Sequence, residues 1–402
     1  MDKAMFEAAM AEAVDGGVIS GAACIAGLSD GSTLYEGAFG KNGAELDATA
    51  MRMDTVMWIA SCTKLLTSIA ALQCVERGLL ALDAPVSDIL PELGSPSILT
   101  GLDADNGKPN LCKASKAITL RQLLTHTSGF AYVGMNQALT MYSAQVYGEP
   151  PSFKLDSPKY GFELPLVFEP GESWEYGVSL EWVGRMVERV NGDKKLGEFM
   201  QDNIFDVLGM NLTTFRPWAR PEVLERMGGR TWRNPETGKI AIDESGWFPF
   251  IEPEADYGGG GAYTCAVDYV KVLMSLLLND GKLLTSETVE MFFTPQLDDS
   301  TAVALCRELS TGPIAVGATN GLPRDRLFNH GLGGAMCMES IPEHCARGMM
   351  FWSGLPNSFW FIDREAGVCG MYLSHMFPPG DQPTQKLNAK FQQFAYVAGS
   401  RL

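Results

Sequence analysis

The most informative stretch of the chain is Trp58-Ile59-Ala60-Ser61-Cys62-Thr63-Lys64. It opens a segment, Ser61 to Arg77, that lacks Gly and Pro, repeats apolar residues at helical spacing and stops at Gly78. We therefore expect a helix there. Ser61 and Lys64 are three residues apart, and side chains at that spacing are neighbours on a helix, with about 5–6 Å between Cβ atoms. The amine of Lys64 can thus reach the hydroxyl of Ser61.

This serine–lysine pair suits nucleophilic chemistry. A serine hydroxyl is a poor nucleophile until a base takes its proton, and the start of a helix favours developing negative charge. The spacing alone is weak evidence, because an N-cap serine followed by an exposed lysine gives the same pattern. The neighbours strengthen it: residues 56–60 and 65–66 are apolar, and a lysine in an apolar setting is costly unless it has a partner or a task.

Strand patterns lie on both sides of this helix. A helical segment to about Gly16 precedes two β-like runs, Gly21–Leu28 and Ser32–Phe39, which a short turn joins into a hairpin. Towards the C-terminus we expect strands at Gly348–Trp352, Phe359–Asp363 and Gly367–Ser374, followed by a helix over about Gln385–Val397.

The middle of the chain, roughly residues 90–250, contains many prolines and three helical patterns, at Leu120–Leu124, Leu180–Val190 and Leu196–Leu208. Strands at both ends with helices between them indicate an α/β (α+β) fold, with an antiparallel sheet built from both termini and flanked by helices. We expect this domain to comprise residues 1–92 and 251–402, with an inserted, mostly helical domain over 93–250.

Composition excludes several classes of function. The 402 residues carry 31 Lys and Arg against 48 Asp and Glu, a net charge of −17, and such an acidic surface repels nucleic acids and acidic membranes. No apolar run approaches the ~18 residues that a membrane span needs. The four histidines show no metal spacing and no phosphate-binding glycine loop occurs, so we expect neither a metal nor another cofactor.

Two features indicate the cytoplasm. The N-terminus, Met1 to Glu7, is acidic where a secretory signal is basic, and no apolar segment follows it. The nine cysteines are scattered without a Cys-x-x-Cys pair, and a chain of this length needs no disulfides for stability. We therefore expect a cytoplasmic protein with reduced thiols.

Five motifs, in order and over nearly the whole chain, resemble the serine β-lactamase and penicillin-binding superfamily. Within it, the chain is most similar to family VIII esterases and to the fungal lovastatin-pathway type of acyltransferase (transesterase). The resemblance implies a serine β-lactamase-like fold. The motifs are residues 58–64 with 71–78, residues 118–129, residues 169–171 with 174–177, residues 328–334, and residues 352–357 with 361–363.

The resemblance implies roles for individual residues. Ser61 is the nucleophile that takes the acyl group, and Lys64 and Tyr176 form the base system. Either the ammonium of Lys64 lets Tyr176 act as a phenolate, or neutral Lys64 takes the proton while Tyr176 protonates the leaving group. The oxyanion hole consists of the N–H of Ser61 and the N–H of Leu355.

Two departures from β-lactamases concern the substrate. Val178 stands where they have an asparagine that recognises an amide, and Trp352 stands where they have a lysine that recognises a carboxylate. We therefore expect little β-lactam turnover and a pocket suited to an apolar or aromatic acyl group or alcohol. The residues expected to bind substrate are Trp352, Tyr132, Trp174, His330, Val178 and Gly354, whereas His126 is expected to be a structural turn residue.

We expect an ester-processing serine enzyme of fungal secondary metabolism. It takes an acyl group from a small ester or thioester onto Ser61 and passes it to an alcohol or to water. An acyl carrier protein or a coenzyme A thioester is open as donor, although an acidic carrier protein would be repelled. Four arginines form a local basic cluster that is either solvated surface or a docking site for an anionic donor: Arg220, Arg226, Arg230 and Arg233. The alternatives are atypical chemistry, such as dehydration or cyclisation, and a catalytically silent binding protein.

Overall fold

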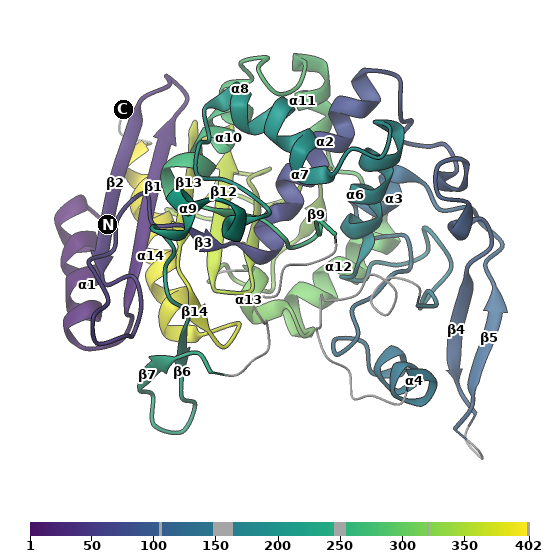
Figure 1. Ribbon diagram of the computed structural model, residues 1–402, viewed down its shortest axis with the longest axis horizontal. Coiled ribbons are helices and arrows are strands. Elements are labelled where there is room, and N and C mark those ends of the chain that lie inside the picture. The colour runs from purple at the N-terminus through teal and green to yellow at the C-terminus, as the bar shows by residue number, and fades with distance from the viewer. Residues whose placement is uncertain (104–106, 148–163, 245–254, 320, 400–402) are drawn as a thin grey trace.

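The centre of the fold is a seven-stranded antiparallel sheet with the strand order β2-β1-β13-β12-β11-β10-β9 (Figure 1). The computed structural model describes residues 1–103, 107–147, 164–244, 255–319 and 321–399. The strands of this sheet are β1 (Gly21–Leu28), β2 (Thr33–Gly40), β9 (Phe328–His330), β10 (Ala335–Cys337), β11 (Met350–Gly354), β12 (Ser358–Asp363) and β13 (Val368–Leu373).

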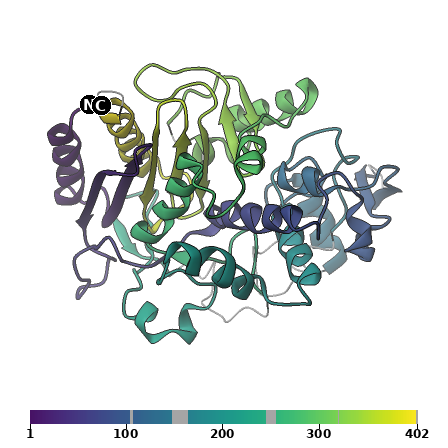
Figure 2. The same cartoon turned by 90° about the horizontal axis from the view of Figure 1, so that it is seen from above.

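The two ends of the chain meet in this sheet, as the sequence predicts. β1 pairs with β13 so that Ile25 lies opposite Met371. Helices α1 (Lys3–Asp15) and α14 (Gln382–Gly399) pack on one face and α10 (Ala266–Leu278) on the other, which Figure 2 shows from above. Because helices cover both faces, all eight residues of β1 are buried, and the strand is a continuous run of small and apolar residues.

Helix α2 (Thr63–Glu76) crosses the middle of the molecule and packs against α6 (Ser179–Val190) (Figure 2). It follows a short 3₁₀ turn, η1 (Ala60–Cys62). Every residue from Thr63 to Cys74 is buried, which explains why this stretch has no charged, solvent-facing side. Lys64 is the one charged residue within this buried run.

The remaining helices surround this core. The expected helical segments at residues 120–124, 180–190 and 196–208 are confirmed, and the C-terminal strands and helix lie where expected, with ends that differ by up to three residues. In the described part of the chain, the other helical elements are η2 (Val86–Asp88), η3 (Pro91–Leu93), α3 (Leu120–Leu124), α4 (Gln137–Tyr147), α7 (Leu196–Met200), η4 (Gln201–Phe205), α8 (Asp206–Leu208), η5 (Pro217–Ala219), α9 (Pro221–Leu224), α11 (Ser286–Phe292), α12 (Asp299–Thr311) and α13 (Ala315–Thr319).

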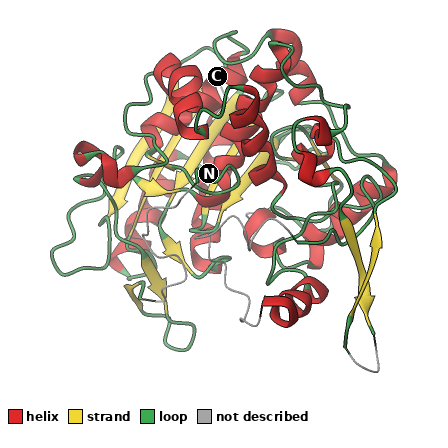
Figure 3. Cartoon of the chain, turned by 45° about the vertical axis from the view of Figure 1, so that its right-hand side comes forward, coloured by secondary structure: helices red, strands yellow, loops and turns green. Residues whose placement is uncertain are grey.

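The middle of the chain also contains strands that the pattern of apolar residues does not predict. A hairpin of β4 (Ser97–Leu102) and β5 (Pro109–Lys113) projects from the body of the protein (Figure 3). A second hairpin joins β6 (Thr231–Arg233) to β7 (Ile240–Ile242), and β6 also pairs with β14 (Met376–Phe377) near the C-terminus. These strands are short and partly exposed, so they lack a long alternation of apolar residues.

The division into two domains stays a prediction. Its boundary between residues 250 and 251 falls within residues 245–254, which lie outside the described residues. The pairing of β6 with β14 links the end of the middle segment to the C-terminal part of the chain. Across the described ranges, no helix combines the length and the apolar character needed to cross a membrane.

Candidate active site

Ser61 lies in η1, between a short strand and the buried helix α2. The strand, β3 (Met57–Trp58), pairs with β8 (Tyr263–Thr264), and the indole N–H of Trp58 donates to the carbonyl of Gly260 at 2.6 Å. Ala60 has a φ of 43°, in the left-handed region that residues with a Cβ rarely adopt. This strained turn redirects the chain from the strand into the helix directly at Ser61.

Lys64 points back at Ser61, as the spacing predicts. Its side chain is only 4% exposed, and its Nζ donates to the Ser61 Oγ at 3.2 Å. The same ammonium donates to the Tyr132 Oη at 3.1 Å and to the carbonyl oxygen of Gly259 at 2.7 Å. Three oxygens therefore fix the amine beside the serine hydroxyl, which satisfies the hydrogen-bonding needs of a buried cation.

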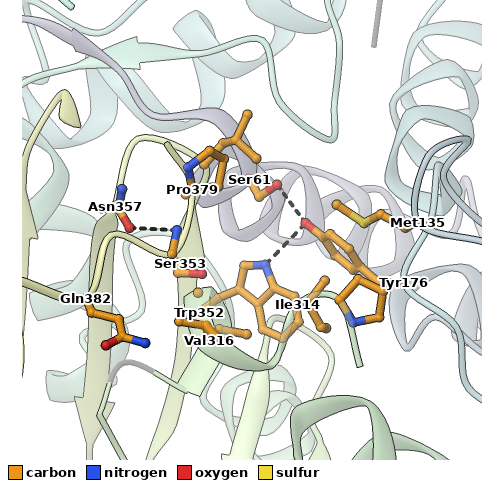
Figure 4. Close-up of a pocket in the computed structure, with 16 residues that line it drawn as sticks. Ser61, Met135, Tyr176, Ile314, Val316, Trp352, Ser353, Asn357, Pro379 and Gln382 are labelled. Carbon is orange, nitrogen blue, oxygen red and sulfur yellow. Dashed lines mark hydrogen bonds between the residues drawn. The ribbon is translucent and has the colours of Figure 1, made fainter. Parts of the chain in front are cut away.

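Tyr176 also contacts the hydroxyl of Ser61. Its Oη lies 2.6 Å from the Ser61 Oγ, and the indole N–H of Trp352 donates to the same Oη at 3.4 Å (Figure 4). The Lys64 Nζ lies 4.7 Å from the centre of the Tyr176 ring. One hydroxyl thus contacts both an amine and a phenol, the two groups that the family resemblance leads us to expect beside Ser61.

Two loops pack backbone to backbone to bring the tyrosines together. The N–H of Tyr132 donates to the carbonyl of Tyr176 at 3.3 Å. A Cβ on Gly177 would lie 2.2 Å from the carbonyl oxygen of Phe130, so only glycine allows this close approach. The two loops therefore hold Tyr132 and Tyr176 on the same side of Lys64.

A pocket of about 300 Å³ opens in front of Ser61 (Figure 4). Ser61 and Tyr176 lie at its edge, and Trp352 forms part of its wall. The other lining residues are uncharged: Met135, Pro313, Ile314, Val316, Gly317, Ala318, Ser353, Gly354, Leu355, Asn357, Pro379, Gly380 and Gln382. Such a lining suits a small, mainly apolar group with a few polar contacts.

The end of β11 reaches this pocket because Gly354 has no side chain. A Cβ there would lie 2.3 Å from the carbonyl oxygen of Ile59, so a larger residue would push β11 away from η1. Gly354 and Leu355 both line the pocket beside Ser61. Among the described residues, the N–H of Leu355 has no hydrogen-bond acceptor, and it is therefore available to a ligand.

The residues expected to bind substrate are placed differently from one another. Trp352 and Gly354 line the pocket, whereas the hydroxyl of Tyr132 is used by Lys64. Trp174 is fully buried and its ring stacks on that of Tyr176, with the centroids 6.4 Å apart. Val178 is also buried. It lies directly before α6, whose first residues are buried as well. Neither of these two lines the pocket wall.

Two buried histidines lie behind the site. The ring of His126 lies 5.0 Å from that of Tyr176 and 5.8 Å from that of His330. Burial lowers the pKa of His126 well below its usual 6.5, and it lowers the pKa of His330 to about 4. Both rings are therefore neutral at pH 7. His126 has a φ of 59°, so it occupies a turn position, as expected, and His330 contacts the wall from behind.

Some residues of the site carry weak sequence signals. Glu181 is 3% exposed and contacts the Gly259 backbone beside Lys64, but in sequence it resembles the acidic residue common in a first helical turn. Ile314 and Val316 line the pocket from the short α13 region, which shows no periodic pattern. Within the described ranges, no three His, Cys, Asp or Glu side chains gather where a metal ion would be held.

Ser61 lies at the start of a buried helix, an amine and a phenol contact its hydroxyl, and it lines a pocket. This arrangement is typical of serine hydrolases and acyltransferases. The chain belongs to the family described as Beta-lactamase, whose model matches residues 6–393. It shares the fold of that family, as expected.

The relatives narrow the class. The chain is 37% identical over 401 residues to the ML-236A carboxylate methylbutanoyltransferase of Penicillium citrinum, an alignment that covers 97% of this chain and 93% of the relative. It is 36% identical over 360 residues to the lovastatin esterase of Penicillium rubens, covering 89% of each. Unliganded simvastatin synthase from Aspergillus terreus matches with a TM-score of 0.91 and 34% identity, over 98% of each chain. The chain is thus a serine acyltransferase or esterase that acts on small molecules.

Proposed function

We propose that the protein takes an acyl group from an ester or thioester onto Ser61 and passes it to an alcohol or to water in fungal secondary metabolism. The observation that carries this proposal is the contact of the Ser61 Oγ with the Tyr176 Oη at 2.6 Å and with the Lys64 Nζ at 3.2 Å, at the edge of a pocket. Relatives named as an acyltransferase and as an esterase support both second steps.

In the first step the Ser61 Oγ attacks the carbonyl carbon of the donor while its proton leaves. The proton passes to Tyr176 acting as a phenolate beside the Lys64 ammonium, or to neutral Lys64, with Tyr176 then protonating the leaving group. The bond between the acyl carbon and the donor oxygen or sulfur breaks, and the acyl group stays on Ser61. In the second step an alcohol or water attacks and the proton transfers run in reverse.

The oxyanion of each tetrahedral intermediate is assigned to two backbone N–H groups. The N–H of Ser61 lies in a helical turn, and that of Leu355 follows directly after β11. Gly354 supports this assignment, because its missing side chain lets β11 approach Ile59 and so brings Leu355 to the pocket that Ser61 also lines. One such donor contributes about 3–4 kcal/mol in other serine enzymes.

The acyl group is proposed to be short and apolar. Ile314, Val316 and Met135 line the pocket, whose volume of about 300 Å³ suits a small branched chain. Trp352 offers an indole where a β-lactamase would offer an ammonium, so a substrate carboxylate gains no charge partner there. By its name, the Penicillium citrinum relative transfers a methylbutanoyl group, which is consistent with this size.

Intact-mass spectrometry tests this function. We expect short branched esters and thioesters to add the mass of one acyl group to the protein, and peptide mapping to place that mass on Ser61. Addition of an alcohol acceptor is expected to discharge the adduct faster than water alone. A protein that stays unmodified across the panel, with no ester product formed, would contradict the proposal.

The four arginines predicted as a basic cluster offer little charge to a donor. Each faces a carboxylate, and two of those carboxylates are almost fully buried. The pairs are Arg220 with Glu222, Arg226 with Asp54, Arg230 with Asp243, and Arg233 with Asp381. Because each guanidinium is already paired, this cluster does not support docking of an anionic donor.

A cationic groove beside the pocket is a better site for such a donor. Arg324, Lys386 and Lys390 line it, and none of these three has a carboxylate in ion-pair distance among the described residues. Gln382 lines both the groove and the pocket of Ser61, so the two are adjacent. We therefore propose a donor whose thioester arm carries phosphate, as coenzyme A thioesters do, with the phosphate in the groove. A whole acidic carrier protein would meet the net charge of −17.

Reversing two charges tests the groove. The double variant Lys386→Glu/Lys390→Glu is expected to lower kcat/KM for a coenzyme A thioester on the order of tenfold, because two attractive charges become repulsive. The effect should shrink at high salt, and a simple ester of the same acyl group should be used at the wild-type rate. The matched control is Lys116→Glu/Lys282→Glu, at exposed lysines outside the groove. Equal losses for both donors or in both double variants would contradict a phosphate site.

The free thiols of the protein support a proposal for its cellular compartment. The nine cysteines of the sequence are all free thiols in the structure, and seven of them are buried. Thiols persist in the reducing cytoplasm. We therefore propose a cytoplasmic location.

A further inference from the structure

Glu181 is a buried carboxylic acid next to the reactive cluster that the proposed mechanism does not use. It lies in the first turn of α6, the helix that packs against α2, and it is 3% exposed. Burial of a carboxylate is costly unless hydrogen bonds or a counter-charge compensate. The contacts of Glu181 therefore need an explanation.

Gly259 links Glu181 to Lys64. The Glu181 Oε2 accepts the N–H of Gly259 at 2.7 Å, and the carbonyl oxygen of the same residue accepts the Lys64 Nζ at 2.7 Å. A Cβ on Gly259 would lie 2.2 Å from the Glu181 Oε1 and 3.3 Å from the Lys64 Nζ. Both side chains thus press against the same face of this glycine, and any larger residue would separate them.

When Tyr176 is in its phenol form, the charge of the Lys64 ammonium is balanced only if Glu181 is counted. The three atoms that accept hydrogen bonds from Lys64 belong to Ser61, Tyr132 and Gly259, and hydroxyl and carbonyl oxygens carry no formal charge. A buried ammonium needs a counter-charge, and Glu181 is the carboxylate that faces it across Gly259. The N–H and the carbonyl of Gly259 belong to the two peptide groups on either side of its Cα, so Glu181 and Lys64 hold this one residue from both of its peptide groups.

We infer that Glu181 is a positioning residue whose ionised carboxylate, facing Lys64 across Gly259, holds the Lys64 ammonium against the hydroxyl of Ser61. The inference rests on the proposed function in the form in which Lys64 acts as an ammonium beside Tyr176, because an ionised carboxylate favours the charged form of a lysine. Glu181 itself does not contact the reacting atoms. Its loss should therefore weaken acylation without preventing it.

This role makes acylation depend on pH near neutrality. Burial raises the pKa of Glu181 to about 7, although the charge of Lys64 and the N–H of Gly259 oppose that rise. As pH increases through this value the carboxylate ionises, Lys64 gains its counter-charge, and the acylation rate increases. Below it, Glu181 is neutral and the rate falls.

His126, His330 and Tyr132 also face this cluster and have shifted pKa values, but none of these values lies near 7. The pKa of His126 lies well below 6.5 and that of His330 is about 4, in both cases because burial disfavours the charged ring. Burial raises the pKa of Tyr132 well above 10, and the nearby charges of Tyr176 and Glu181 add to that rise. An inflection near pH 7 that is present in the wild type and lost in Glu181→Gln is therefore assigned to Glu181, since a change in packing alone would not remove it.

The test measures the rate at which a serine-directed phosphonate labels Ser61 between pH 5 and 9, using mass spectrometry. The wild type is expected to show a rate that increases with an inflection near pH 7. Glu181→Gln should lose this inflection and label roughly 10- to 100-fold more slowly above it, the range seen when an orienting partner is removed elsewhere. Glu181→Asp should keep an inflection, because it restores the charge, but at a lower rate.

Glu188→Gln is the matched control. Glu188 lies on the same helix, is 4% exposed and accepts the N–H of Leu196, away from Lys64. This variant should keep the wild-type pH profile. The inference would be overturned if folded Glu181→Gln kept the wild-type inflection. If Glu181→Gln fails to fold, the inference would be overturned by a wild-type rate and pH profile in Glu181→Asp. A wild type that is not labelled at Ser61 at any pH would instead overturn the proposed function.

Discussion

Replacement of Ser61 by alanine is expected to abolish the acyl adduct and to reduce acyl transfer by roughly a thousandfold or more. The reason is that no other group takes over the bond to the acyl carbon. The Ser61 Oγ is the atom that both Tyr176 and Lys64 contact, and it lies at the pocket edge. Removal of this one atom leaves the amine and the phenol in place without a nucleophile between them.

The measurement combines intact mass with product formation from a short thioester. Ser353→Ala is the matched control, because Ser353 is a second serine in the pocket wall and is half-buried. This control should keep the adduct and most of the turnover. An adduct that persists in Ser61→Ala, or one that disappears in Ser353→Ala while the protein stays folded, would move the nucleophile away from Ser61.

Replacement of Tyr176 by phenylalanine is expected to lower the rate of acylation by about 10² to 10⁴, the usual contribution of a general acid or base. The ring and its packing on Trp174 and His126 are kept, so the loss reports the hydroxyl alone. That hydroxyl lies 2.6 Å from the Ser61 Oγ, and in the proposed mechanism it accepts the serine proton or protonates the leaving group. Single-turnover labelling by mass spectrometry separates this step from product release.

Tyr132→Phe distinguishes the catalytic phenol from its neighbour. The two tyrosines lie side by side, with ring centroids 5.2 Å apart, but the Tyr132 Oη contacts Lys64 and not the reacting oxygen. We therefore expect a loss of no more than about tenfold, consistent with one supporting hydrogen bond. Equal losses in the two variants, or a larger one in Tyr132→Phe, would contradict the assignment of Tyr176.

Helix α2 shows why the local part of the site was predictable. Ser61 and Lys64 are joined by a single helical turn, and the apolar residues around them indicate that the turn is buried. Burial in turn explains why Lys64 needs several hydrogen-bond partners. The strands β1 and β13 were predictable for a similar reason, because a strand covered on both faces is continuously apolar.

The pocket was less predictable, because neighbouring positions in a motif face different environments. Trp352 lines the pocket from β11, whereas Trp174 packs in the core. Gly354 was also hard to interpret from the sequence. It allows the backbone of β11 to lie close to Ile59, and no residue pattern reveals that contact. Whether a side chain lines a cavity depends on the path of its backbone and on which residues pack over that side chain.

Sequence by itself determined the chemistry at one end of α2 and the meeting of both chain ends in one sheet, because helical spacing and strand periodicity are local properties. The resemblance to family motifs predicted Tyr176. Local sequence spacing could not, because Tyr176 lies far from Ser61 in the chain. Only the tertiary structure decided that Glu181 and Gly259 lie behind Lys64, and that the α13 region covers the pocket. These groups come from segments far apart in the sequence, and the free energy that brings them together belongs to the packing of the whole core rather than to any one segment.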